Sequence, residues 1–144
     1  MDIELALNTL HKFRQVNKYE TFREILPSIV FLPKRERELV TKILDHCAHD
    51  LILLLRQGNK KAIKKELKIV LIECMDALAI AKINSDNREF GYQLGWYLAE
   101  KVHINLKTGT EKKLWGYWQV EGFEVSVPIR PRISTKAKER VNNN

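Results

Sequence analysis

One short stretch holds the densest group of side chains that could bind a metal: Asp45, His46, Cys47, His49 and Asp50. Imidazole, thiolate and carboxylate groups are all transition-metal ligands. If the stretch is helical, Cys47 points to one side while Asp45 and His49 point to the other, so the five groups diverge. Only His46 and Asp50, one turn apart, share a face, and we expect a local pair there. The sequence therefore predicts neither a metal site nor a cofactor, and an enzyme built on His46 and Asp50 is the least favoured function.

The two cysteines offer a second kind of chemistry. Cys47 and Cys74 each lie at the centre of an apolar stripe with helical spacing, and buried thiols of this kind are usually inert. A catalytic thiol would need a partly exposed, electropositive environment. The sequence also contains no Gly-x-Ser-x-Gly, no phosphate-binding glycine loop and no His-Glu-x-x-His. We therefore predict a non-enzymatic protein with two buried, unlinked cysteines.

Lysines crowd the start of a predicted helix at residues 59–83, at positions 60, 61, 64, 65 and 68. Positive charge at this end opposes the helix dipole, so the cluster is locally unfavourable. Together with a basic C-terminal tail, Lys60, Lys64 and Lys68 could contact phosphates, an acidic protein or an anionic membrane surface. The simpler interpretation is a solvated face. No helix-turn-helix or RNA-binding signature supports a nucleic-acid partner.

Large aromatic residues gather in two places. Tyr92 and Trp96 lie one helical turn apart. Close together further along the chain come Trp115, Tyr117 and Trp118. Aromatic residues with polar tips are enriched at protein interfaces, which makes Tyr92 and the three tryptophans candidates for binding a partner. The competing interpretation is that they form core contacts between a C-terminal hairpin and the helix before it.

The composition is that of an ordinary globular protein, since 44% of the 144 residues are hydrophobic and 30% are charged. A chain of this length usually forms one domain and can bury a core without metals or disulfides. Residues 130–144 differ, with five basic residues, one acidic residue and three final asparagines. We expect them to form a disordered basic tail that carries most of the net charge of +7. Residues 1–129 should form one helical domain with a C-terminal hairpin.

The cellular location is predicted from three features. No basic N-terminal region followed by an apolar segment is present, so we expect no secretory signal. The longest apolar run, residues 51–55, is far shorter than the roughly 20 residues that span a bilayer. Two cysteines do not make a disulfide framework, which favours a reducing compartment. The sequence therefore predicts a cytoplasmic protein without a membrane span.

Hydrophobic periodicity predicts helices at residues 2–16, 19–26, 33–58, 59–83 and 86–103. The Gly58-Asn59 junction is short, so the two long helices that it joins should pack as an antiparallel hairpin. The helix at 59–83 is apolar nearly all round, which favours the middle of the bundle. Asp86 and Glu89 have the spacing of a capping box. The expected fold class is therefore mainly α, a four- to five-helix bundle.

The C-terminal third changes from a helical period to the period of a strand. Alternating residues predict an antiparallel hairpin over 110–129 that turns at Glu121-Gly122. Gly91 and Gly95 lie four residues apart on the preceding helix, which suggests that another backbone approaches closely there. We therefore expect the hairpin to dock on that helix. The alternative for 110–118 is a short helix.

The segment Asp86-Asn87-Arg88-Glu89-Phe90, followed by an amphipathic helix and then Leu114-Trp115-Gly116-Tyr117, resembles a pattern in small uncharacterised bacterial proteins of the toxin-immunity type. The resemblance implies a protein that binds and neutralises a cognate toxin. The positive net charge departs from the acidic balance common among inhibitors of nuclease toxins, which argues against a nuclease partner. The leading function is therefore a protein-binding module, with an immunity protein as its specific form. The alternative is a basic nucleic-acid-associated protein.

Overall fold

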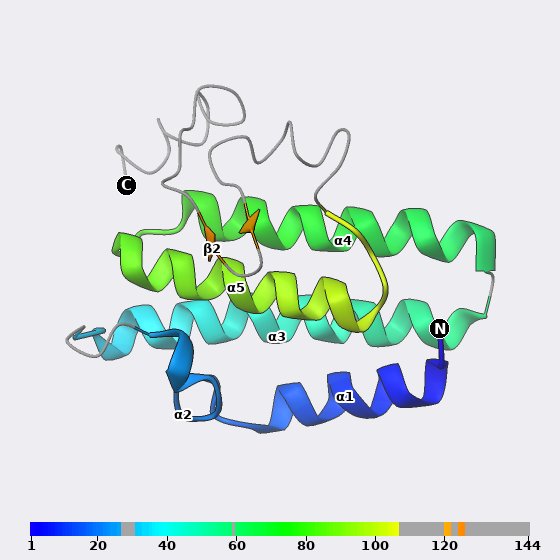
Figure 1. Ribbon diagram of the computed structural model, residues 1–144, viewed down its shortest axis with the longest axis horizontal. Helices are drawn as coiled ribbons and strands as arrows, with labels where there is room; N and C mark the ends of the chain where they lie inside the picture. Colours follow the sequence, from blue (N-terminus) through cyan, green and yellow to red (C-terminus); the bar gives the residue numbers. More distant parts are fainter. Residues whose placement is uncertain (27–30, 59, 107–119, 122–123, 126–144) are drawn as a thin grey trace.

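Five α-helices make up most of the computed structural model (Figure 1). The structure describes residues 1–26, 31–58, 60–106, 120–121 and 124–125, and of residues 60–62, 120–121 and 124–125 it describes the backbone alone. The helices are α1 (Ile3–Gln15), α2 (Lys18–Thr21), α3 (Lys34–Gln57), α4 (Lys60–Ile80) and α5 (Ser85–Lys101). A short 3-10 helix, η1 (Arg23–Ile25), follows α2. The prediction of a mainly helical fold is confirmed.

Local sequence signals explain the ends of α1 and α3. Asp2 caps α1, because its carboxylate accepts a hydrogen bond from the backbone N–H of Leu5 (3.1 Å). Gly58 ends α3 with a φ of 81°, a left-handed conformation that glycine adopts without steric cost. The helix predicted over 19–26 is broken, because α2 ends at Thr21 and the chain tightens into η1.

The N-terminus of α5 differs from its prediction. Asn84 is the N-cap, and its side-chain oxygen accepts a hydrogen bond from the backbone N–H of Asn87 (2.8 Å). Asp86 lies inside the first turn, where its charge favours the helix dipole. The predicted capping box between Asp86 and Glu89 is therefore wrong, because Asn84 already holds the capping position.

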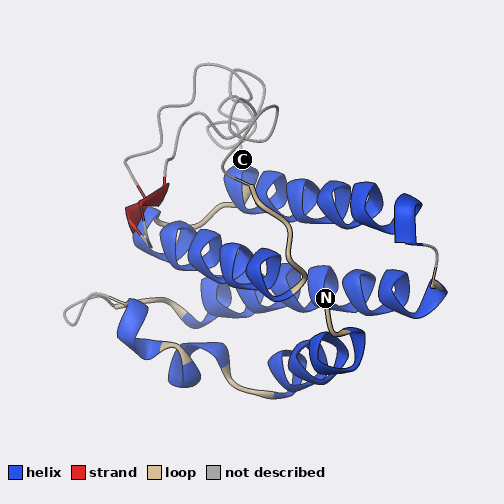
Figure 2. Cartoon of the chain, turned by 45° about the vertical axis from the view of Figure 1, so that its right-hand side comes forward, coloured by secondary structure: helices blue, strands red, loops and turns tan. Residues whose placement is uncertain are grey.

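The longest helix, α3, lies at the centre of the bundle. It packs against α1, α4 and α5, and Figures 1 and 2 show α3 and α4 side by side with α5 lying against both. The prediction that the 59–83 helix occupies the middle is wrong. One apolar face of α4 is not enclosed, since Ile69 is 46% exposed and Ile72 is half-buried. The second apolar face of α4 therefore belongs to an outer helix.

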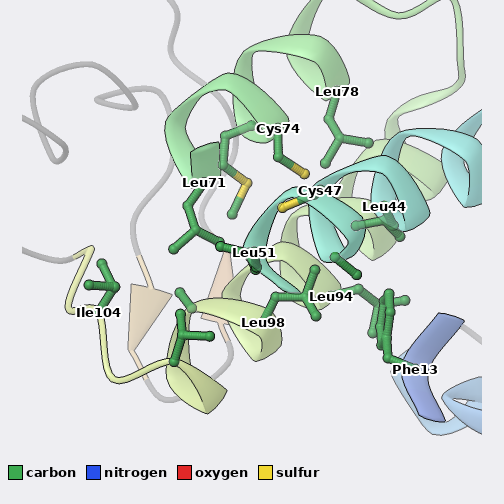
Figure 3. Close-up of a cluster of buried hydrophobic side chains, with 14 of the residues drawn as sticks. Phe13, Leu44, Cys47, Leu51, Leu71, Cys74, Leu78, Leu94, Leu98 and Ile104 are labelled. Atoms are coloured by element: carbon green, nitrogen blue, oxygen red, sulfur yellow. The ribbon is translucent and has the colours of Figure 1, made fainter. Parts of the chain in front are cut away.

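The core fills the space between α3, α4 and α5 with leucines and the two cysteines (Figure 3). Cys47 and Cys74 are 3% and 5% exposed and are free, which confirms the prediction that both are buried and unlinked. Gly91 and Gly95 face side chains of α4. A Cβ on Gly91 would lie 2.7 Å from Leu78, and a Cβ on Gly95 would lie 2.8 Å from Met75. These glycines therefore admit α4 side chains to the surface of α5.

Two short strands, β1 (Val120–Glu121) and β2 (Glu124–Val125), pair antiparallel with Val120 opposite Val125. β2 lies against α5. The rest of the predicted hairpin over 110–129 and the predicted tail at 130–144 lie outside the described residues. Over the part of the chain that is described, none of the helices is both long enough and apolar enough to cross a membrane.

Candidate functional site

A cationic pocket of about 750 Å³ opens between α3 and the corner at which α1 passes into α2. Five cationic side chains line it, and they are Arg14, Lys18, Lys34, Arg37 and Lys42. Only two carboxylates, Glu38 and Asp45, line the same pocket. Concave sites lined by one sign of charge concentrate ions of the opposite sign. The pocket is therefore suited to an anion.

The wall contributed by α3 follows from helical geometry. Lys34, Glu38, Thr41, Asp45 and His49 succeed one another at intervals of three or four residues, so they form one polar stripe along the helix. The opposite stripe of α3 holds core residues. This stripe presents polar groups toward the α1–α2 corner, where the pocket lies.

Lys18 anchors the floor of the pocket. Its side chain is 1% exposed, and its ammonium donates to the carbonyl oxygens of Phe13 (2.7 Å) and Val16 (3.3 Å) at the end of α1. The same ammonium pairs with Asp45 of α3 (2.5 Å) and lies 4.7 Å from the centre of the Phe13 ring. A cation at this place complements the negative end of the α1 dipole. Lys18 therefore joins α1 to α3, and its own charge is neutralised.

Tyr19 fixes the other side of the corner. Its hydroxyl donates to the side-chain oxygen of Asn87 (2.5 Å), and its ring stacks on Phe90 with centroids 4.5 Å apart. Burial raises the pKa of Tyr19 far above its ordinary value, so this hydroxyl stays protonated. The tyrosine thus ties the α1–α2 corner to α5 and supplies no charge to the pocket.

The remaining cations keep most of their charge available to a ligand. The nearest carboxylate to Lys34 is that of Glu38 at 3.9 Å, and both side chains are exposed, so this pair contributes little. Arg14 donates to a ring nitrogen of His49 (3.3 Å). Arg37 uses its Nε to bond the carbonyl of Leu32 (3.0 Å), which leaves the terminal guanidinium nitrogens for another acceptor.

The five potential metal ligands divide between two cavities. Asp45 and His49 line the cationic pocket, while Cys47 and Asp50 line a second cavity between α3 and α4, and His46 lies on the border of both. His46 and Asp50 form the local pair that their spacing predicts, with 3.3 Å between nitrogen and oxygen. Among the described residues no three His, Cys, Asp or Glu side chains lie close enough to hold one metal ion.

We therefore predict that removal of metal has no effect on folding. Dialysis against a strong chelator should leave the melting temperature unchanged, because His46 and Asp50 satisfy one another without an ion. The measurement is a thermal scan before and after dialysis. A fall in melting temperature that added zinc reverses would contradict the prediction.

The structure separates the predicted partner-binding residues. Tyr92 is completely buried and Trp96 is half-buried against the core. Lys64 is exposed and Lys68 is half-buried. Trp115 and Trp118, and the side chain of Lys60, lie outside the described residues. The described members do not form one surface, and none of them lines the cationic pocket.

Sequence reasoning missed the cationic pocket. The polar stripe from Lys34 to His49 was a usable signal, because a helix with one apolar and one polar stripe shows which residues face away from the core. Arg14 and Lys18 could not be added to it from sequence alone. Their position depends on the corner between α1 and α2, which no local pattern specifies.

The chemistry of the cationic pocket is that of an anion-binding site. Ammonium and guanidinium groups on flexible stems surround a hollow, and a buried ion pair fixes its floor. No family model, no curated protein and no solved structure matches the sequence.

Proposed function

We propose that the protein is a cytoplasmic, non-enzymatic binding module that receives an acidic segment of a protein partner in its cationic pocket. The observation that carries this proposal is the excess of cations over carboxylates inside one hollow between α3 and the α1–α2 corner. Charge complementarity of this kind speeds association and selects partners. An immunity protein that neutralises a toxin is the specific form of the proposal, and an acidic face on that toxin would meet the pocket.

A nucleic-acid partner is the alternative function. The exposed lysines near the start of α4, such as Lys64 and Lys65, favour this alternative. The cationic pocket favours a protein, because Glu38 and Asp45 lie among its cations and would repel a closely spaced row of phosphates. A few carboxylates from an acidic segment fit a single hollow better than a continuous phosphate backbone does.

The proposal predicts that a glutamate-rich peptide binds the pocket. The double substitution Lys34→Glu and Lys42→Glu should weaken this binding on the order of 100-fold, since two attractive contacts become repulsive. Both lysines are exposed, so the fold should survive. The measurement is a peptide titration by calorimetry or fluorescence anisotropy at physiological salt.

The matched control is the double substitution Lys64→Glu and Lys65→Glu, which changes the net charge equally on exposed positions of α4. It should leave peptide affinity within about twofold of the parent, because salt screens charges that lie outside the pocket. A DNA oligonucleotide titrated in parallel tests the alternative. Tight DNA binding that the α4 substitutions abolish and the pocket substitutions spare would replace the proposal with the nucleic-acid function.

A further inference from the structure

The second cavity, of about 420 Å³, lies between α3 and α4 and carries both cysteines on its wall. Leu39, Ile43 and Val70 give it an apolar lining. At its edge it is lined by polar groups that include Lys42, His46, Asp50 and Glu73. The two thiols therefore border a space that a small uncharged molecule can enter, although little of either side chain is exposed.

The two sulfur atoms face one another across the contact between the helices. Figure 3 shows the Cys47 and Cys74 side chains pointing toward each other from α3 and α4. The neighbouring Cys74 thiol and burial raise the pKa of Cys47 well above its ordinary value. A raised pKa means that Cys47 keeps its proton. The two side chains thus lie next to one another on the wall of one cavity.

We propose that Cys47 and Cys74 form a reversible disulfide when the protein meets a peroxide, a modification that links α3 to α4 beside this cavity. The sulfur of one cysteine attacks one peroxide oxygen, the O–O bond breaks, and a sulfenic acid and one water result. The sulfur of the other cysteine then attacks the sulfenic acid sulfur and displaces its hydroxyl, which leaves with the thiol proton as a second water. Two thiols are oxidised and one hydrogen peroxide is reduced to two waters.

A disulfide suits this place better than a metal thiolate. The apolar surroundings of Cys47 and Cys74 penalise thiolate anions, whereas a disulfide carries no charge. The link would also close the long loop of chain that runs from α3 through Gly58 to the middle of α4. Closing such a loop restricts the unfolded chain, so the oxidised protein should melt several degrees higher than the reduced protein.

The test is oxidation of the folded wild-type protein by hydrogen peroxide, followed by digestion with trypsin without reductant. We expect peptides 43–56 and 69–82, which contain Cys47 and Cys74, to appear as one linked species that has lost two hydrogen atoms. The disulfide should form within one chain, so that non-reducing electrophoresis shows no covalent dimer, and dithiothreitol should restore both thiols. Cys47→Ala and Cys74→Ala, each with one thiol left, should give no linked peptide and no rise in melting temperature.

Met1 serves as the internal standard, because it is 52% exposed and reacts with peroxide whatever the cysteines do. If Met1 is fully converted to its sulfoxide while both cysteines still alkylate after denaturation, the proposal is wrong. Separate oxygen adducts on the two cysteines without a linked peptide would overturn it as well.

Discussion

Replacement of Lys18 by alanine is expected to lower the free energy of unfolding by about 3 kcal/mol. The substitution leaves Asp45 without its cation in a site where 29% of the carboxylate side chain is exposed. It also removes the hydrogen bonds to the carbonyls of Phe13 and Val16 at the end of α1. Removing one member of a buried ion pair costs about 3–5 kcal/mol, and the partial exposure of Asp45 places this case at the lower end. Urea denaturation measures the loss.

The control for this prediction is Lys12→Ala, on the exposed side of α1 near the same helix end. It should leave the unfolding midpoint almost unchanged. The double substitution Lys18→Met and Asp45→Leu should recover most of the stability, because an apolar pair of similar size avoids the uncompensated charge. If Lys18→Ala is as stable as Lys12→Ala, Lys18 does not hold α1 to α3.

The stability of this corner matters for the proposed function. Lys18 and Tyr19 fix the floor of the cationic pocket through Asp45 and Asn87, while Lys34 and Lys42 are exposed on its wall. Substitutions at the wall should therefore change affinity without changing stability. Substitutions at the floor should change both, so the two sets of variants separate folding from binding.

Helices were predictable because their signals are local. The apolar stripes and Gly58 specify α3 and the junction to α4 within a few residues of where they lie. The predictions failed where two local signals compete. Asn84 and Asp86 can both cap a helix, and only the conformation of the chain shows that Asn84 holds that position.

Tertiary placement was the harder part of the prediction. The apolar faces of α4 indicated a central helix, yet α3 takes the centre and Ile69 of α4 remains 46% exposed. Periodicity shows that a face is apolar and does not show which neighbour covers it. The cationic pocket was missed for the same reason, because Arg14 reaches His49 only through the packing of α1 on α3.

Tyr92 shows how burial decides between two interpretations of an aromatic residue. Its sequence position is compatible with an interface and with a core. In the structure the side chain, which comes from α5, is completely buried in the core. We therefore expect Tyr92→Ala to lower the free energy of unfolding by about 4 kcal/mol, as large aromatic truncations in cores do. Chemical denaturation measures the change.

Two further variants test whether the loss of stability comes from the burial of the ring. Tyr92→Phe keeps the ring and should lose much less stability than Tyr92→Ala, because ring burial supplies most of the effect. Trp96→Ala, one turn away on a half-buried side chain, should cost about 2 kcal/mol, since less apolar surface leaves water on folding. If Tyr92→Ala instead unfolds like the parent protein, its ring contributes nothing to the core. The tyrosine would then have to be accessible in solution, and it would return to the set of residues that a partner can bind.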